Sequence, residues 1–413
     1  MESNSVRRVI ERLLSSADIK IDGDRPWDPQ VHNEKLYASV LAHGSLGMGE
    51  SYMDGWWDCD RLDEFACRIL RAELDKKIHP RSDFPHFLRA KLFNLQKPSR
   101  AFEIGRHHYD IGNDLYRCML DQRMIYSCGY WQHAATLNEA QEAKLDLVCQ
   151  KLGLQPGMRV LDIGCGWGGA AKFAAERYGV EVVGITVSRE QEQFGRKLCQ
   201  RLPVEIRFQD YRKAEGTFDR IFSLGMIEHV GYKNYGTFMR VVRGHLREDG
   251  LFLLHTIGNN RSVTSTDPWI ARYIFPNSMI PSAKQLAGAI EGVFVLEDWQ
   301  NFGYDYDKTL MQWFRNFDEN WPALKWKFDD RFYRMWKFYL LSCAGAFRAR
   351  QNQVWQLVLS PNGVKSGWRR DRQQSQLGKE SNLLLTNWVL RPLLEAVGCG
   401  PSPVFANRVP PTA

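Results

Sequence analysis

Closely spaced glycines at Gly164, Gly166 and Gly168 are the first residues in this sequence whose type and spacing suggest chemistry. They follow an apolar run at residues 160–163 and precede a segment with helical character. Glycine adopts backbone angles that are closed to other residues, and the first turn of a helix has free N–H groups. A ligand can approach bare backbone at such a turn, so the sequence predicts a cofactor site there.

The glycines alone do not identify the cofactor, because Gly164, Gly166 and Gly169 also satisfy the dinucleotide-binding pattern. Asp162 lies two residues before the first glycine, where its carboxylate would repel a pyrophosphate and attract a cationic amino-acid group. S-adenosylmethionine carries an ammonium and a sulfonium but no phosphate. The next expected strand ends in Thr186, where nicotinamide cofactors normally require Asp or Glu. These residues favour S-adenosylmethionine as co-substrate, and a nicotinamide oxidoreductase is the alternative.

Two ionisable residues, Glu228 and His255, lie at the ends of apolar segments further along the chain. Glu228 follows the segment 218–224, and His255 lies near the end of the segment 251–257. Burying either one is costly without a partner, so their placement favours a shared active-site pair. Asp210 and Tyr211 follow another apolar segment. We interpret them as adenine-recognition residues, with the carboxylate accepting from the amino group and the ring stacking nearby. A surface turn is the alternative.

The elements that must position these residues alternate regularly between strand and helix, which is typical of a doubly wound, mostly parallel α/β sheet. Ligands in such sheets bind beyond the carboxyl ends of the strands. The expected strands are 159–163, 180–186, 204–208, 218–224, 251–257 and 354–359, and the expected helices are 62–74, 138–152, 168–178, 188–200, 234–246 and 332–350.

Composition narrows the cellular setting. The net charge of +7 suits an anionic membrane surface or a nucleic acid. No run of 18 apolar residues exists, and charged residues interrupt the only place for a signal peptide, so we expect a cytoplasmic protein. The nine cysteines are odd in number and form no Cys-x-x-Cys pair, which predicts free thiols, no disulfide framework and no metal site.

Several segments together resemble the cyclopropane fatty acid synthase family, kin of the mycolic acid cyclopropane synthases. The segments that carry the resemblance are GSLGMGESYMDGWW, HHYDIGNDLY, IYSCGYW, VLDIGCGWGG, GMIEHVG, LLHTIG, DPWIARYIFPN, NFGYDYDKTL and CAGAFRAR, within residues 44–350. The resemblance implies a class I S-adenosylmethionine-dependent methyltransferase fold. It also implies methylene transfer to the cis double bond of an unsaturated acyl chain in a membrane phospholipid, which forms a cyclopropane ring and releases S-adenosylhomocysteine.

That chemistry passes through a carbocation, which must lose a proton before water or a side chain traps it. The pocket must therefore be dry, and aromatic rings can stabilise the cation. In the family a bound bicarbonate ion takes the proton. The positions matching its holder are Cys128, Glu228, His255, Tyr306 and the backbone of Ile257. His255 is expected to pass the proton onward, since its side chain titrates nearest neutral pH.

The resemblance also assigns the donor site. Tyr126 and Ser127 should contact the methionine part, as should the loop that includes Asp162, Gly164, Cys165, Gly166, Trp167 and Gly168; Thr186 and Gln191 should contact the ribose, and Gln209, Asp210 and Tyr211 complete the site. The mycolic relatives carry a tryptophan and a glutamate about where this chain has Tyr211 and Arg212, so the second contact departs from their pattern.

Cys343 is the last candidate for the catalytic set, as a nucleophile. A packing role is favoured, because a thiolate beside the carbocation would trap it. Two alternatives remain open at the level of function. One is a lipid-binding protein without catalysis, and the other is a methyltransferase that forms a branched chain in place of a ring.

The lipid substrate suggests a domain plan. We expect a lipid-docking domain at residues 1–100, a catalytic domain with acyl-covering helices at 101–360, and a basic, poorly ordered tail at 361–413. An amphipathic helix at 84–95 is expected to lie on a bilayer or to pack on its own domain. The expected partners are therefore an anionic membrane surface and not nucleic acid, with the protein peripheral to the inner face of the membrane and a homodimer.

Overall fold

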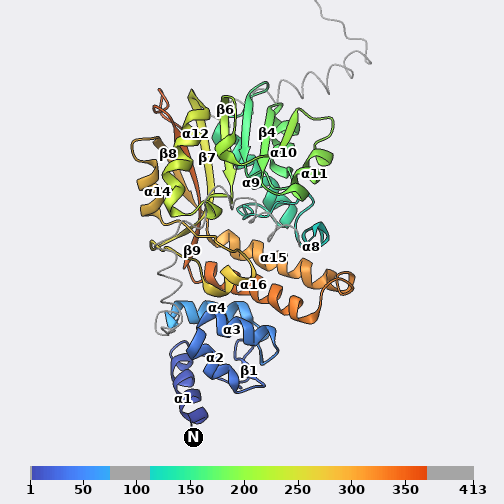
Figure 1. The fold of residues 1–413 in the computed structure, drawn as a ribbon, viewed down its shortest axis with the longest axis vertical. Coiled ribbons are helices and arrows are strands. Elements are labelled where there is room, and N and C mark those ends of the chain that lie inside the picture. Colours follow the sequence, from blue (N-terminus) through green and yellow to red (C-terminus); the bar gives the residue numbers. More distant parts are fainter. Residues whose placement is uncertain (1, 75–111, 370–413) are drawn as a thin grey trace, which may run out of the picture. The chain divides into compact units, whose positions relative to one another are not determined.

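The computed structural model describes residues 2–74 and 112–369 of the chain (Figure 1). The described residues up to Trp368 form one compact unit. The amphipathic helix expected at 84–95 and the part of the expected tail beyond residue 369 lie outside the described residues. Among the described helices, none is both long and apolar enough to cross a membrane.

The central element is a seven-stranded sheet with the strand order β5-β4-β3-β6-β7-β9-β8. The strands β3 to β7 run parallel, and β9 lies antiparallel between β7 and β8. The prediction of a doubly wound, mostly parallel sheet is confirmed. The strand bounds are β3 Arg159–Ile163, β4 Glu181–Thr186, β5 Val204–Phe208, β6 Phe218–Leu224, β7 Leu246–Asn259, β8 Val295–Asn301 and β9 Asn352–Ser360.

Two strands differ from expectation for physical reasons. The strand β7 begins earlier than predicted because Phe218 pairs with Leu246 before a register shift, after which Arg220 pairs with Leu251. The strand β8 was not predicted. It lies at the edge of the sheet and none of its residues is buried, so it lacks the apolar alternation that marks a half-buried strand.

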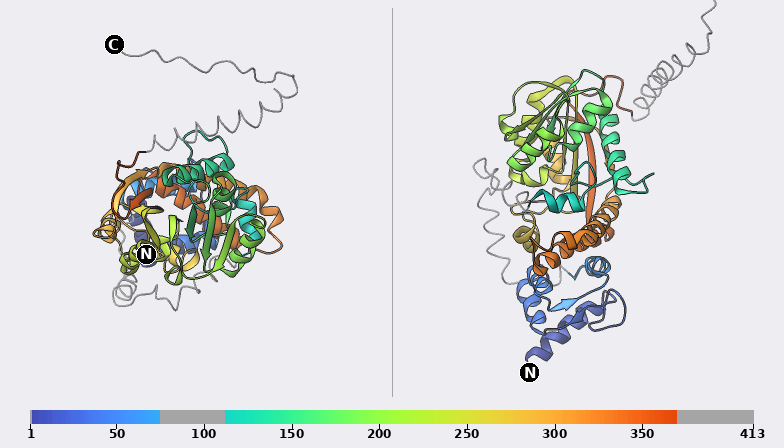
Figure 2. Two further views of the ribbon diagram at one scale, coloured as in Figure 1. Left: turned by 90° about the horizontal axis from the view of Figure 1, so that it is seen from above. Right: turned by 90° about the vertical axis from the view of Figure 1, so that its right-hand side faces the viewer.

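Helices cover both faces of the sheet (Figures 1 and 2). The helices α9, α10 and α11 pack on one face, and α12 and α14 pack on the other with a shared apolar core. The helix α9 begins with a capping box, in which Thr136 and Glu139 satisfy each other's backbone N–H groups. The bounds are α9 Leu137–Leu152, α10 Gly169–Tyr178, α11 Arg189–Leu198, α12 Tyr235–His245 and α14 Ala283–Ile290.

A second helical layer lies at the carboxyl ends of the strands. Figure 1 and the right-hand view of Figure 2 place α15 and α16 between the sheet and the N-terminal helices. The helices α15 and α16 pack on each other, and α16 also packs on α3 and α4. The bounds are α8 Asn113–Met119, α13 Pro268–Tyr273, α15 Tyr304–Asn320 and α16 Asp330–Arg348.

The N-terminal segment is mainly helical. It comprises α1 Glu2–Ser15, α2 Lys35–His43, α3 Ser45–Met53, α4 Leu62–Arg71 and a two-stranded sheet of β1 Gln30–Val31 and β2 Trp57–Asp58. Residues 44–57 contain several glycines, yet most of this segment is the helix α3. Glycine serves close packing here, since a Cβ on Gly49 would lie 2.3 Å from the ring of Trp269.

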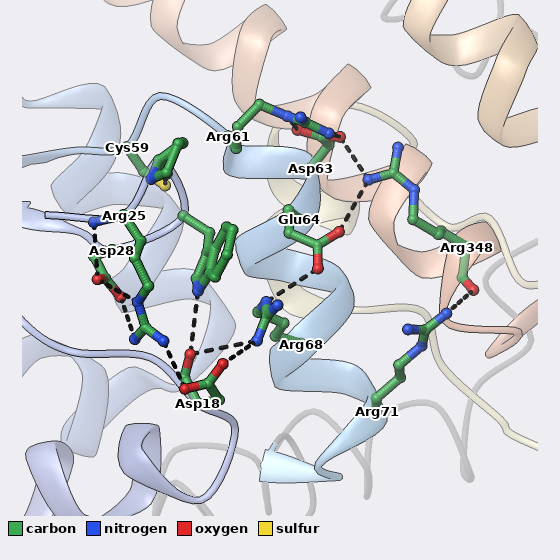
Figure 3. A network of polar contacts seen from close by, with 12 residues as sticks. Asp18, Arg25, Asp28, Cys59, Arg61, Asp63, Glu64, Arg68, Arg71 and Arg348 are labelled. Carbon is green, nitrogen blue, oxygen red and sulfur yellow. Dashed lines mark hydrogen bonds and ion pairs between the residues drawn. The ribbon is translucent and has the colours of Figure 1, made fainter. Parts of the chain in front are cut away.

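Buried ion pairs join α4 to α16 (Figure 3). The Arg348 guanidinium donates to Asp63 at 2.6 Å and to both carboxylate oxygens of Asp307 at 2.9 Å. Arg71 donates to the Arg348 carbonyl oxygen at 3.2 Å. These contacts fix the N-terminal helices against the layer that covers the carboxyl ends of the strands.

Candidate active site

A first cavity of about 170 Å³ lies at the carboxyl ends of β3 to β6. Twelve of the thirteen residues predicted for the donor site line it, namely Tyr126, Ser127, Asp162, Gly164, Cys165, Gly166, Trp167, Thr186, Gln191, Gln209, Asp210 and Tyr211. Gly168 is not among the lining residues. It caps the start of α10 with a φ of +85°, and a Cβ there would face the thiol of Cys199 at 3.3 Å.

The glycine loop is tied to the neighbouring strand. The N–H groups of Gly164 and Cys165 both donate to the Ile185 carbonyl oxygen at 3.0 Å. Gly164 has a φ of +84°, and a Cβ there would lie 2.8 Å from Met226. Gly166 has a φ of +54° and would place a Cβ in open space. The loop therefore keeps bare backbone beside the cavity.

Asp162 provides the test of whether a cationic cofactor fits. Its side chain is buried, and its Oδ2 atom has no hydrogen-bond partner among the described residues. Burial raises the pKa of Asp162 to about 8, against the opposing effect of the Lys144 ammonium. A buried carboxylate without a partner is costly. An amino group of a ligand would offset that cost, so the site fits S-adenosylmethionine.

The far wall of this cavity is prearranged by side-chain pairs. The Thr186 hydroxyl donates to Gln191 Oε1 at 2.8 Å. Arg212 lies in the same wall and donates to both carboxylate oxygens of Asp210, at 2.8 and 2.5 Å. The Asp210 carboxylate, expected to be available to an adenine amino group, is thus already engaged by Arg212. Sequence reasoning missed this pair, although the two residues are only two positions apart.

A second, larger cavity of about 640 Å³ lies beside the first. Five predicted catalytic residues line it: Glu228, His255, Ile257, Tyr306 and Cys343. Much of the remaining wall is apolar and comes from the N-terminal helices and from α15 and α16. The cavity can hold a long apolar chain next to a small polar group.

Glu228 is the polar centre of this cavity. Its Oε1 atom accepts from the Ile257 N–H at 2.7 Å, and its Oε2 atom is buried without a hydrogen-bond partner among the described residues. Burial raises the pKa of Glu228. The resemblance assigns the backbone of Ile257 to bicarbonate, and in this structure its N–H group donates to Glu228. The unpartnered Oε2 atom can therefore accept a hydrogen bond from the hydroxyl group of a ligand.

His255 lies deep in the site, and only 2% of its surface is exposed. Its Nδ1 atom lies 3.4 Å from Gln356 Nε2, which can donate to it. Burial, with the nearby Lys144 and Lys151 ammonium groups, lowers the pKa of His255 well below its usual value. The imidazole is thus neutral near pH 7, which favours a hydrogen-bonding role over the expected onward transfer of a proton.

The two candidate cysteines differ in position. Cys128 is fully buried and lines neither cavity. Its thiol donates to the carbonyl oxygen of the next residue, Gly129, at 3.1 Å. Cys343 lines the larger cavity, and burial raises the pKa of its thiol to about 12. A protonated thiol is a poor nucleophile, which supports the packing interpretation of Cys343.

Four residues line both cavities and mark their junction: Tyr126, Ser127, Gly225 and His229. The Tyr126 hydroxyl lies 2.9 Å from the hydroxyl of Tyr339, a residue of α16. Burial lowers the pKa of His229 to about 4, so this imidazole is neutral. Sequence analysis did not select His229, although its position beside Glu228 was an available signal.

Sequence analysis also missed the support beneath Ser127. Gln141 and Lys144 are fully buried on one face of α9. Gln141 Nε2 donates to the Ser127 carbonyl oxygen at 2.8 Å, and Lys144 Nζ donates to Ser127 Oγ at 2.8 Å. Polar side chains on the apolar face of an otherwise amphipathic helix were the signal that could have revealed them.

The strand order, the glycine loop and the cavity beyond the strand ends define the class I fold of S-adenosylmethionine-dependent methyltransferases. The family model for mycolic acid cyclopropane synthetase matches residues 96–357. The chain belongs to this family, which confirms the resemblance and the expectation of a C-methyltransferase.

Individual relatives agree with this assignment. The chain is 52% identical over 363 residues to cyclopropane-fatty-acyl-phospholipid synthase of Escherichia coli (strain K12), covering 88% of this chain and 95% of that protein. The solved cyclopropane synthase MmaA2 from Mycobacterium tuberculosis is 31% identical with a TM-score of 0.60, covering 65% of this chain and 99% of that one. Mycolic acid cyclopropane synthase CmaA1, solved with SAH and CTAB, is 33% identical with a TM-score of 0.58, covering 62% and 97%.

Proposed function

We propose that this protein transfers a methylene group from S-adenosylmethionine to the cis double bond of an unsaturated acyl chain in a membrane phospholipid. The product is a cyclopropane ring, and S-adenosylhomocysteine is the by-product. The observation that carries this proposal is the junction at Tyr126, Ser127, Gly225 and His229, where the cavity lined by the predicted donor residues meets the larger, mostly apolar cavity that contains Glu228. A methyl donor and an alkene can meet only at such a junction.

The donor cavity would bind and orient S-adenosylmethionine. Asp162 attracts the ammonium group, and the backbone of the glycine loop permits close approach. Thr186 and Gln191 present a fixed pair of polar groups toward the ribose. Tyr211 packs edge-on against Phe238 at 5.3 Å, which holds its ring beside the expected adenine position.

The larger cavity would hold the acyl chain and exclude water. Aromatic rings in its wall, including Trp269, Phe275 and Tyr306, can stabilise a carbocation without forming a bond to it. The thiol of Cys343 stays protonated and so does not trap that cation. A dry wall with few nucleophiles suits an intermediate that must lose a proton and not gain a bond.

The proton would be removed at the polar group around Glu228. Bicarbonate, when bound, would supply the base. Glu228 Oε2 is the acceptor for its hydroxyl group, while Tyr306 and neutral His255 offer further hydrogen bonds. Cys128 lines neither cavity, so its part in this holder would have to come through the backbone of its segment.

The setting of the reaction is also proposed. A phospholipid substrate places the protein at the inner face of a membrane as a peripheral protein, with residues 1–100 as the docking domain. The net charge of +7 supports attraction to anionic lipid. A homodimer is part of the proposal, and sedimentation of the purified full chain tests that part.

Incubation of the purified chain with S-adenosylmethionine and unsaturated liposomes tests the proposal. Anionic and neutral lipids are compared, each with and without added bicarbonate. We expect S-adenosylhomocysteine release, ring protons in the proton NMR spectrum of the lipid, faster turnover on anionic vesicles and stimulation by bicarbonate. A branched methyl product would replace the ring assignment, and tight lipid binding without S-adenosylhomocysteine release would overturn the enzymatic one.

A further inference from the structure

Lys144 is a charged side chain inside the protein whose position has no explanation in the reaction described so far. Its side chain is fully buried on α9, although lysine is almost never fully buried without a partner. Among the described residues, the only acceptor within hydrogen-bond distance of its Nζ atom is Ser127 Oγ, at 2.8 Å. Lys144 does not line either cavity, whereas Ser127 lines both.

The contact fixes the direction of the Ser127 hydroxyl. A lysine ammonium has three donors and no acceptor, so the serine oxygen must accept. The Ser127 hydroxyl hydrogen is then directed away from Lys144, and it donates to no residue in the described part of the chain. Gln141, one turn before Lys144, holds the Ser127 carbonyl oxygen at 2.8 Å and so prevents the segment from turning.

An O–H donor aimed into the donor cavity fits an anionic oxygen. S-adenosylmethionine carries one such group, the methionine carboxylate, in addition to its ammonium. Charge assistance strengthens a hydrogen bond to a carboxylate, and the ammonium behind Ser127 polarises the hydroxyl further. Asp162 lies in the same cavity and suits the ammonium, so the two groups would recognise the two charged ends of the amino acid.

We propose that Lys144 is a positioning residue that acts through Ser127. Its ammonium occupies the acceptor side of the hydroxyl and thereby aims the Ser127 O–H at the carboxylate of the bound methyl donor. This inference rests on the proposed use of S-adenosylmethionine but not on the lipid chemistry. Bicarbonate is the competing anion, because Ser127 also borders the larger cavity.

A double-mutant cycle on the purified full chain tests the proposal by calorimetric titration. The variants are Lys144→Met, Ser127→Ala and the double variant. The ligands are S-adenosylhomocysteine, its decarboxylated analogue and methylthioadenosine. Lys144 also favours the ionised form of Asp162, so Lys144→Met should weaken both ligands that carry an ammonium group. That contribution is the same with Ser or Ala at position 127, and it cancels in the cycle.

We expect each single variant to weaken S-adenosylhomocysteine by about tenfold or more, with clear coupling between the two positions. The coupling should vanish for the decarboxylated analogue, and methylthioadenosine should bind all variants equally. Lys151→Met is the matched control, since Lys151 is equally buried on α9 but pairs with Asp298 at 2.8 Å. It should leave the affinity for S-adenosylhomocysteine unchanged.

Zero coupling for S-adenosylhomocysteine, or equal losses for methylthioadenosine, would overturn the proposal. A bicarbonate requirement that rises in Lys144→Met while the affinity for S-adenosylhomocysteine is unchanged would assign the hydroxyl to bicarbonate in its place. Because these titrations need no lipid, failure of the liposome reaction would leave their outcome interpretable.

The wild-type protein supplies a second test in case Lys144→Met does not fold. Burial lowers the pKa of Lys144 to about 8, and the groups that act on it are Asp121, Cys128 and Asp162, with His255 also within its field. The preference for S-adenosylhomocysteine over the decarboxylated analogue should fall as the pH rises through that value. Taking the ratio cancels the ionisation of Asp162, which both ligands share. A preference that does not change with pH, or one that changes equally in Ser127→Ala, would refute the role of Lys144.

Discussion

Replacing Glu228 by glutamine should separate the base-holding site from the donor site. The Glu228 carboxylate has one oxygen occupied by the Ile257 N–H at 2.7 Å and one buried oxygen without a partner among the described residues. Glutamine can keep the first contact through its carbonyl oxygen, but it then presents an NH₂ group where the second acceptor was. Losing a hydrogen bond with a charged partner costs about 1.5–3 kcal/mol. Because 1.4 kcal/mol corresponds to a factor of ten, kcat should fall about 10- to 150-fold.

The assay compares turnover on unsaturated anionic liposomes with the affinity for S-adenosylhomocysteine, measured separately by titration. We expect Glu228→Gln to lower kcat, to raise the bicarbonate concentration needed for half-maximal rate, and to change the donor Kd by less than about twofold. Burial raises the pKa of Glu228, and the proposed role needs the carboxylate. Wild-type activity should therefore fall as the pH drops through a value above the ordinary glutamate range. An equal loss of donor affinity, or unchanged turnover, would refute the role assigned to Glu228.

Three other perturbations give distinct outcomes. Gly166→Val should lower the affinity for S-adenosylhomocysteine by tenfold or more while the fold persists. The φ of +54° disfavours a β-branched residue, and the valine side chain would enter the open donor space. Retained tight binding in a titration would contradict this. With its pKa near 12, Cys343 should react with iodoacetamide at pH 8 about a thousandfold more slowly than a thiol of ordinary pKa, as peptide mass spectrometry can measure, and Cys343→Ala should keep most activity. Arg348→Met should lower the free energy of unfolding by about 3–5 kcal/mol, since it leaves the buried carboxylates of Asp63 and Asp307 without this partner. An unchanged midpoint of unfolding in urea would show that these ion pairs add no stability.

Most of the sheet could be predicted because each strand carries its own signal. The strands β3, β5 and β6 begin and end where the apolar runs do, and turns with glycine or polar residues separate them. The edge strand β8 lacks that signal because one of its sides faces solvent. The helix α3 was not predicted because it contains several glycines, which are poor helix formers. In the structure these glycines allow α13 and α2 to approach closely.

The site could be predicted as a set of positions but not as a set of contacts. Twelve donor-site residues surround one cavity because the carboxyl ends of parallel strands meet at one edge. The partners of these residues come from tertiary packing, which local patterns do not encode. The spacing of residues along the chain predicts neither the ion pair of Asp210 with Arg212 nor the hydrogen bond from the Ile257 N–H to Glu228.

Two buried carboxylate oxygens, one on Asp162 and one on Glu228, explain why the two cavities suit different ligands. Asp162 Oδ2 and Glu228 Oε2 are both buried without hydrogen-bond partners among the described residues, at a cost that folding must offset elsewhere. At Asp162 the Lys144 ammonium favours the ionised form, so the site suits a ligand that brings positive charge. At Glu228 the largest opposing contribution is the N–H group of Ile257, a neutral donor, so the site suits a ligand that donates a hydrogen bond. The proposed methyl donor and the proposed bicarbonate match these needs, and the shared wall at Ser127 and His229 would bring them within reach of one alkene.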